Sequence, residues 1–283
     1  MDSDGSKEPL LPRMPMATYI QLFDKSEGSG NKTSLFRRLL PHIARLCLVS
    51  TFIEGSFRIY SESTQLTQYF QHVWHTSEGV ASVLVVYQFL SHIVPVFFIM
   101  FRYYVGPAVI VLGVTVIVQV ILYYIVVTFT FLARDISVFG ALILLYAETL
   151  EEKKYFLSGS QEVTDNNRPK GYMFCTGRFL LLFMLFSLIE YDTSFLQLLD
   201  IVIAIVLLVF VTIGYKTTIS SIILVFWLLM LNFILHPYWT SPGGFDDFQK
   251  YSFYQTLSVI GGFLLLICYG PGGVSVDYHY KKK

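Results

Sequence analysis

The chain of 283 residues is 54% hydrophobic and 17% aromatic, and only 14% of its residues are charged. Soluble domains carry about 25% charged residues and fewer apolar ones. Twenty Lys and Arg balance twenty Asp and Glu, which excludes a basic nucleic-acid-binding protein and a polyacidic one. The apolar content excludes disorder as the dominant state. With a mean hydropathy of +0.58, the composition predicts an all-α, polytopic membrane protein.

Apolar runs long enough to cross about 30 Å of hydrocarbon predict eight transmembrane helices. In chain order they are 40–60, 80–101, 105–130, 136–149, 177–192, 197–215, 218–236 and 253–270. The first run is weak because it contains Arg45, Glu54 and Arg58, and the fourth is weak because it is short. Dropping either of them leaves a seven-helix alternative.

The distribution of Lys and Arg favours eight helices over seven. Eight helices place fifteen of the twenty basic residues on one side, with Arg178 just beyond them, and the positive-inside rule makes this side cytosolic; Arg58, Arg134 and Lys250 lie opposite. Arg45 lies one turn inside the first span, and we expect it to snorkel outward. The predicted regions are a flexible cytosolic tail at 1–37, a transmembrane domain at 38–275 and a basic cytosolic tail at 276–283.

A short internal match suggests two pseudo-repeats of four helices. Ser137 and Gly140 in the fourth span recur as Ser258 and Gly261 in the eighth, with similar apolar neighbours. The first spans of the two halves also share an arginine and an acid: Arg45 with Glu54, and Arg178 with Glu190. Four helices is an even number, so the halves would run parallel about an axis along the membrane normal, and the groove between them would be the binding site.

Glu54 and Arg58 are four residues apart, so they share one helix face and can pair. Two interpretations are open: a structural ion pair at the membrane interface, or the lining of a polar cavity, because ionisable residues within spans usually face the bundle interior. The same non-cytosolic side carries nine acids. We call them the acidic mouth: Glu54, Glu62, Glu78, Asp135, Glu190, Asp192, Asp200, Asp246 and Asp247. The positive-inside rule accounts for part of this excess, and binding of an ammonium group is the other interpretation.

Aromatic residues are mixed with these acids, among them Tyr191, Tyr238, Trp239 and Phe253. A membrane-interface belt explains most of them, but a peptide-binding groove with aromatic walls needs them too.

No pattern predicts an enzyme, a cofactor or a metal site. His72 and His75 are three residues apart but lack a third ligand. A nucleophile elbow, a Walker motif, a zinc motif and a dinucleotide fingerprint are all missing from the sequence.

Several stretches resemble the surfeit locus protein four family. They are 40–54 in the first span, 192–195, 214–217, 251–262 in the last span, and 270–275 just after it. The resemblance covers roughly residues 38–283. It implies a multi-pass cargo receptor of the endoplasmic reticulum membrane, which cycles through the ER-Golgi intermediate compartment and the Golgi.

The resemblance also implies the partners. Such receptors collect soluble lumenal proteins, and lipoproteins in animals, into COPII vesicles by reading a hydrophobic-proline-hydrophobic signal at the cargo N-terminus. They return by COPI retrieval through a C-terminal lysine signal, here Lys281, Lys282 and Lys283. The chain departs from the usual dilysine signal because Tyr280 stands fourth from the end. Membrane lipid is a further expected partner, nucleic acid is not one, and self-association is left open.

Placement alone leads to a hypothesis for the cargo site, because no known family site supplies it. The candidate ammonium partners are Glu54, Glu190, Asp192 and Asp246, with Arg58 beside the first of them. The candidate walls are Tyr191, Tyr238, Trp239 and Phe253. A carboxylate would hold the terminal amine and the aromatic rings would hold the apolar side chains that follow it.

Two other classes compete with a receptor. A lipid scramblase or small-molecule transporter needs a polar groove through the membrane, and the main polar residues within spans are few: Gln88, His92, Gln119 and Asn232. A membrane oxidoreductase subunit needs a heme-type histidine pair or a redox cysteine pair, and neither is visible in the sequence.

Overall fold

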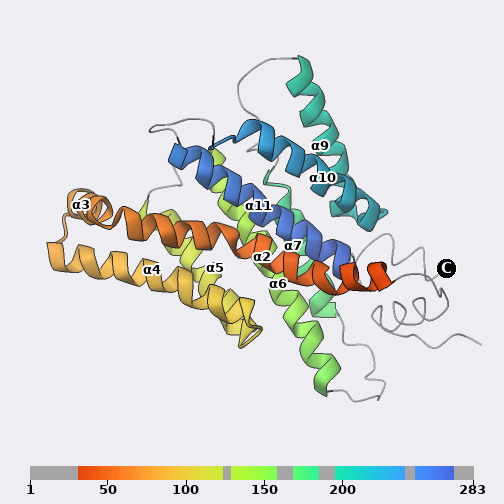
Figure 1. Ribbon diagram of the computed structural model, residues 1–283, viewed down its shortest axis with the longest axis horizontal. Helices are drawn as coiled ribbons and strands as arrows, with labels where there is room; N and C mark the ends of the chain where they lie inside the picture. The colour runs from red at the N-terminus through yellow and green to blue at the C-terminus, as the bar shows by residue number, and fades with distance from the viewer. Residues whose placement is uncertain (1–30, 124–128, 158–167, 185–194, 240–245, 271–283) are drawn as a thin grey trace, which may run out of the picture. The chain divides into compact units, whose positions relative to one another are not determined.

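The computed structural model describes residues 31–123, 129–157, 168–184, 195–239 and 246–270, and within them the chain is helical, without a strand (Figure 1). The helices are α2 (Asn31–Ser61), α3 (Ser63–Trp74), α4 (Glu78–Met100), α5 (Val105–Leu122), α6 (Phe129–Leu157), α7 (Arg168–Leu181), α9 (Phe195–Ile213), α10 (Thr217–Leu235) and α11 (Asp246–Tyr269). The chain divides into two compact units, Met1–Leu39 and Leu40–Lys283, and the apolar helices lie in the second.

The predicted all-α, polytopic membrane fold is confirmed. Within the described residues, five helices are long and apolar enough to span a membrane: Glu78–Met100, Val105–Leu122, Phe129–Leu150, Thr217–Leu235 and Gln249–Tyr269. The predicted spans 40–60 and 197–215 fall on α2 and α9, whereas 177–192 shares only residues 177–181 with α7 and from 185 onward lies outside the described residues. However, α2 carries three charges within 40–60, and α7 has only 14 residues, so the count of eight spans stays a prediction.

Helix α3 was not predicted. It has 12 residues and is rich in Thr and Gln, so a search for apolar runs of about 20 residues passes over it. It packs on α4 through Phe70, which is fully buried. The indole of Trp74 at its end donates a 3.2 Å hydrogen bond to the carbonyl of Leu122 on α5.

Helices α6 and α11 run parallel and in register. Asp135 bonds to Gln255 near one end, a Cβ on Gly262 would lie 2.9 Å from the Cβ of Ala141 further along, and Glu148 bonds to Tyr269 near the other end. The last pair is separated by 121 residues in sequence. In the predicted repeat, Ser137 and Ser258 are also 121 residues apart, and so are Gly140 and Gly261. Matching positions of the two segments therefore lie against each other.

Two glycines bring these helices close to their neighbours. A Cβ on Gly140 of α6 would lie 2.7 Å from the Cβ of Leu180 on α7, and a Cβ on Gly261 of α11 would lie 2.5 Å from the backbone nitrogen of Leu48 on α2. Real Cβ atoms do not approach other atoms so closely, so both contacts require glycine. In each case the fourth helix of one predicted half packs against the first helix of the other.

Helix α2 runs antiparallel to α11, because its residue Arg58 meets Tyr251 while its residue Leu48 accepts a hydrogen bond from Ser258. We call the two ends of this three-helix core, formed by α2, α6 and α11, the Arg58 end and the Arg45 end.

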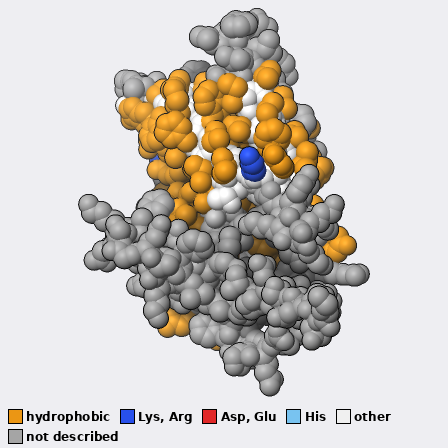
Figure 2. All heavy atoms as spheres, turned by 90° about the vertical axis from the view of Figure 1, so that its right-hand side faces the viewer, with side chains coloured by type: hydrophobic (Ala, Val, Ile, Leu, Met, Phe, Trp, Pro, Cys, Tyr) orange, Lys and Arg blue, Asp and Glu red, His pale blue; other side chains and the backbone are white. Residues whose placement is uncertain are grey.

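Apolar side chains cover the outside of several helices. Val83 and Phe97 on α4 and Phe226 on α10 are 60–70% exposed, and hydrophobic side chains cover most of the described part of the face in Figure 2. Such a surface is stable when lipid covers it, which fits the polytopic membrane fold.

Candidate functional site

Glu54 and Arg58 lie at the Arg58 end of α2. The side chain of Glu54 is buried, at 4% exposed. The guanidinium carbon of Arg58 lies 4.7 Å from the centre of the Tyr251 ring on α11, a cation–π contact of about 0.5–2 kcal/mol. Arg58 also lines a cavity whose lining does not include Glu54, so both interpretations of this pair of residues stay open.

A buried hydrogen-bond network joins α6 to α11 at the same end. Oδ1 of Asp135 accepts hydrogen bonds from Gln255 Nε2 at 2.8 Å and from the Tyr251 hydroxyl at 3.3 Å. The neighbouring Arg134 donates to the hydroxyl of Ser252. The sequence placed Arg134 and Asp135 on the non-cytosolic side, just before a predicted span. The structure places both within α6 and inside the bundle, at 2% and 7% exposed.

A cavity of about 20 Å³ opens among α2, α4, α5, α6 and α11, which is room for about one water molecule. Its polar lining consists of Thr51, Arg58, His92, Gln119, Asp135, Tyr251 and Gln255. The Nδ1 of His92 donates to the carbonyl of Gln88 at 2.7 Å, because a carbonyl oxygen can only accept. Of the polar residues that the sequence showed within spans, His92 and Gln119 therefore meet at one small space, whereas Asn232 bonds to the backbone of Phe253.

Three of the predicted aromatic walls form one cluster. The ring of Tyr238, just after α10, lies 5.2 Å from Trp239 and 5.3 Å from Phe253 of α11. Phe233 of α10 adds a ring 5.4 Å from Phe253. Edge-on ring pairs of this kind contribute about 0.5–1.5 kcal/mol each. Trp239 is 54% exposed whereas Phe253 is 8% exposed, so the cluster has a buried base and an open rim.

The polar surroundings of this cluster are well defined. Asn232 of α10 donates to the carbonyl of Phe253 at 3.1 Å and so ties the two helices together. Tyr254 lies 6.3 Å from Tyr238, ring to ring. Burial lowers the pKa of His236, which follows α10, to about 4. Its imidazole is therefore neutral at physiological pH and adds no positive charge beside the rings.

The remaining predicted site residues cannot be placed. Glu190, Tyr191 and Asp192 lie outside the described residues, as do Lys281, Lys282 and Lys283, and the side chain of Asp246 is not described. Among the described residues, no three His, Cys, Asp or Glu side chains gather as metal ligands would.

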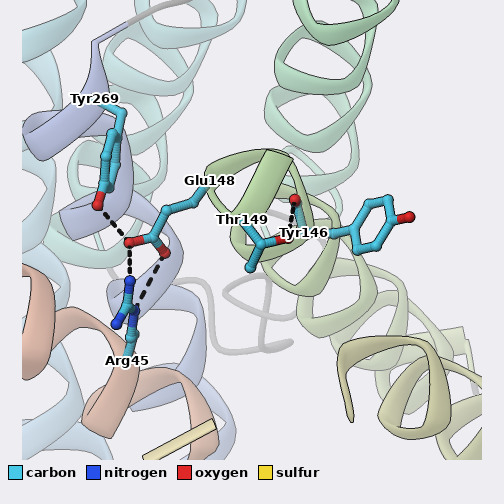
Figure 3. Close-up of polar contacts among 5 residues, drawn as sticks. All are labelled: Arg45, Tyr146, Glu148, Thr149 and Tyr269. Carbon is cyan, nitrogen blue, oxygen red and sulfur yellow. Dashed lines mark hydrogen bonds and ion pairs between the residues drawn. The ribbon is translucent and has the colours of Figure 1, made fainter. Parts of the chain in front are cut away.

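The sequence reasoning missed a buried ionic cluster at the Arg45 end. Nη2 of Arg45 on α2 lies 2.5 Å from Oε1 of Glu148 on α6. The hydroxyl of Tyr269 on α11 donates to the same oxygen (Figure 3). The prediction that Arg45 snorkels outward is wrong, because it is 2% exposed and its charge is compensated inside the bundle. The sequence does contain a signal for this cluster, because Arg45 and Glu148 are opposite charges that both lie within predicted spans.

Comparison with known proteins gives one consistent answer. A model described as the SURF4 family matches residues 23–283. The chain is 39% identical over 248 residues to "Surfeit locus protein 4 homolog" of Drosophila melanogaster, covering 87% of this chain and 92% of that protein. It is 32% identical over 239 residues to "ER-derived vesicles protein ERV29" of Saccharomyces cerevisiae, covering 84% and 76%. It is 27% identical over 248 residues to the homologue of Schizosaccharomyces pombe, covering 86% and 82%. No solved structure shows a significant match.

Proposed function

The chain belongs to the SURF4 family, and on this basis we propose that it is a transmembrane cargo receptor of the endoplasmic reticulum. It captures soluble lumenal proteins by their N-terminal signals and carries them towards the Golgi in COPII vesicles. Lipoproteins are among the cargo if the source is an animal. The printed name of the yeast relative, an ER-derived vesicles protein, supports this location.

The proposed topology has eight spans, in two four-helix pseudo-repeats, with both ends of the chain in the cytosol. The in-register packing of Ala141 on Gly262 and of Glu148 on Tyr269 supports the repeat. A twofold axis that runs between two parallel helices brings each residue of one helix opposite its equivalent on the other. In this topology the Arg58 end faces the lumen.

The observation that carries the proposal is the aromatic cluster of Tyr238, Trp239 and Phe253, with its buried base and open rim. Rings with an open rim suit the apolar side chains and the proline of a cargo signal, and a pre-set proline lowers the ordering cost of binding. The proposed partner of the terminal amine at this end is Glu54. Glu190, Tyr191, Asp192 and Asp246 belong to the same proposed site.

The cytosolic side of the receptor serves its return. Lys281, Lys282 and Lys283 are the proposed COPI retrieval signal, and the connection 148–176 is the proposed coat contact. The receptor then cycles between the endoplasmic reticulum, the intermediate compartment and the Golgi.

Deletion of the protein, followed by quantification of the secretome, tests the function. We expect a defined set of soluble proteins to stay in the cell, and an unchanged secretome would contradict the proposal. For the site, Glu54→Gln should weaken cargo co-precipitation whereas Glu78→Gln, at an exposed acid on α4, should not.

A lipid scramblase or small-molecule transporter is the second candidate, favoured by the polar cavity among five helices. Transfer of dye-labelled lipid in vesicles that contain the purified protein distinguishes the two classes. A receptor leaves the dye in its original leaflet.

A further inference from the structure

In the lining of the cavity at the Arg58 end, two buried oxygen atoms lack a hydrogen-bond partner among the described residues: Oδ2 of Asp135 and Oε1 of Gln255. The two side chains are only 7% and 2% exposed. Their other polar atoms bond to each other, because Gln255 Nε2 donates to Asp135 Oδ1 at 2.8 Å. A buried acceptor without a donor costs about 1–3 kcal/mol, so a ligand that donates to both atoms gains that energy.

Both side chains line the cavity of about 20 Å³. The two unsatisfied atoms are acceptors, so the missing group must be a donor, and the cavity limits it to about the size of a water molecule. A primary ammonium group has this size and three donor hydrogens. It binds a carboxylate about twice as strongly as a neutral donor does.

The charges around the cavity permit a cation. Asp135 is the acid in the lining, and Arg58 is the only Lys or Arg there. Arg58 is half-buried and directs its charge over the Tyr251 ring at 4.7 Å. Arg134, the other cation near Asp135, does not line the cavity and donates to Ser252.

The cavity and the aromatic cluster lie on opposite faces of α11. Tyr251 and Gln255 are four residues apart and line the cavity, whereas Phe253, two residues from each, points to the other side and packs on the rings of Phe233 and Tyr238. The cavity therefore takes the ammonium group alone, and the proposed function supplies a peptide N-terminus that carries one.

We propose that the Asp135–Gln255 cavity is a subsite for a primary ammonium group, and that the free N-terminus of a cargo peptide supplies it. This inference rests on the proposed function and narrows it. Asp135 was part of the acidic mouth but not among the predicted ammonium partners. Its Oδ2, an unsatisfied acceptor in the cavity lining, makes it the residue that contacts the ammonium group.

The test uses the full chain in phosphatidylcholine nanodiscs and two synthetic peptides of one sequence, which begins with a hydrophobic-proline-hydrophobic segment. One peptide has a free N-terminus and the other is N-acetylated. We expect acetylation to weaken binding at least tenfold, and Asp135→Asn to weaken binding of the free peptide to the same degree. The two changes together should be no worse than either alone. Glu78→Gln is the matched control and should bind like the wild type.

A second measurement does not depend on how Asp135→Asn folds. Methylammonium should compete with the free peptide on the wild-type protein, and tetramethylammonium, which has no donor hydrogen, should not.

Each contrary result has a distinct meaning. If acetylation weakens binding but Asp135→Asn does not, the amine binds elsewhere and the inference fails while the proposed function stands. Equal affinity for both peptides means that the cavity holds a water molecule only, which also overturns it. If phosphatidylethanolamine in the nanodisc displaces the peptide, a lipid headgroup is the occupant and the cargo assignment fails. If the wild type binds neither peptide and the secretome is unchanged by deletion, the proposed function itself fails.

Discussion

The ionic cluster at the Arg45 end predicts a large effect of a small substitution. Glu148→Gln keeps the shape of the side chain and removes its negative charge. Arg45, at 2% exposed, then loses the carboxylate that lies 2.5 Å from its Nη2. Removing one partner of a buried ion pair destabilises a protein by about 3–5 kcal/mol, because the other charge stays buried. We expect a loss of this size.

Two further variants separate the charge from the packing. Replacing both partners together, Arg45→Met with Glu148→Leu, removes both buried charges, and such replacements are often neutral or stabilising by about 1–4 kcal/mol. The double variant should therefore be more stable than Glu148→Gln alone. Tyr269→Phe removes one hydrogen bond to a charged group, at a cost of about 1.5–3 kcal/mol.

Reversible unfolding of the purified protein in mixed micelles measures these free energies. The reasoning is refuted if Glu148→Gln lies within about 1 kcal/mol of the wild type, since the lower bound for breaking a buried pair is about three times larger. It is also refuted if the double variant is less stable than Glu148→Gln, because the loss would then come from packing and not from an uncompensated charge.

The remaining predictions concern packing, cargo and retrieval. Gly261→Val should destabilise the protein by at least 1–3 kcal/mol, since its Cβ would lie 2.5 Å from the backbone of α2. As a control, Gly79→Val has open space around it and should leave the free energy of unfolding unchanged. Trp239→Ala, at a side chain 54% exposed, should reduce cargo co-precipitation without lowering thermal stability; unaltered capture would exclude the open rim from the site. Changing Lys281–Lys283 to alanine should shift the steady-state location towards the Golgi in fluorescence microscopy, and an unaltered distribution would mean that retrieval uses another segment.

Much of the helical framework follows from local sequence. Runs such as 80–101 and 218–236 fall on α4 and α10 within one or two residues, because a helix in lipid must satisfy all its backbone groups within the segment. Helix α3 escaped prediction because its 12 residues are too short and too polar to register as an apolar run.

The candidate site was predictable only in part. Tyr238 and Trp239 are adjacent in sequence and Phe253 lies close behind, so their meeting follows from the hairpin of two consecutive helices, α10 and α11. Arg58 meets Tyr251 across almost the whole chain, and no local pattern indicates that contact.

By itself the sequence determined the membrane environment, the helical segments and the family, because hydropathy, helix length and motif similarity are properties of short stretches. Only the tertiary structure decided which charges are compensated. The partners Arg45 and Glu148 are 103 residues apart, and Asp135 and Gln255 are 120 apart. A buried charge in a span must find a partner, but the identity of that partner depends on which helices pack together, and this is a property of the whole bundle.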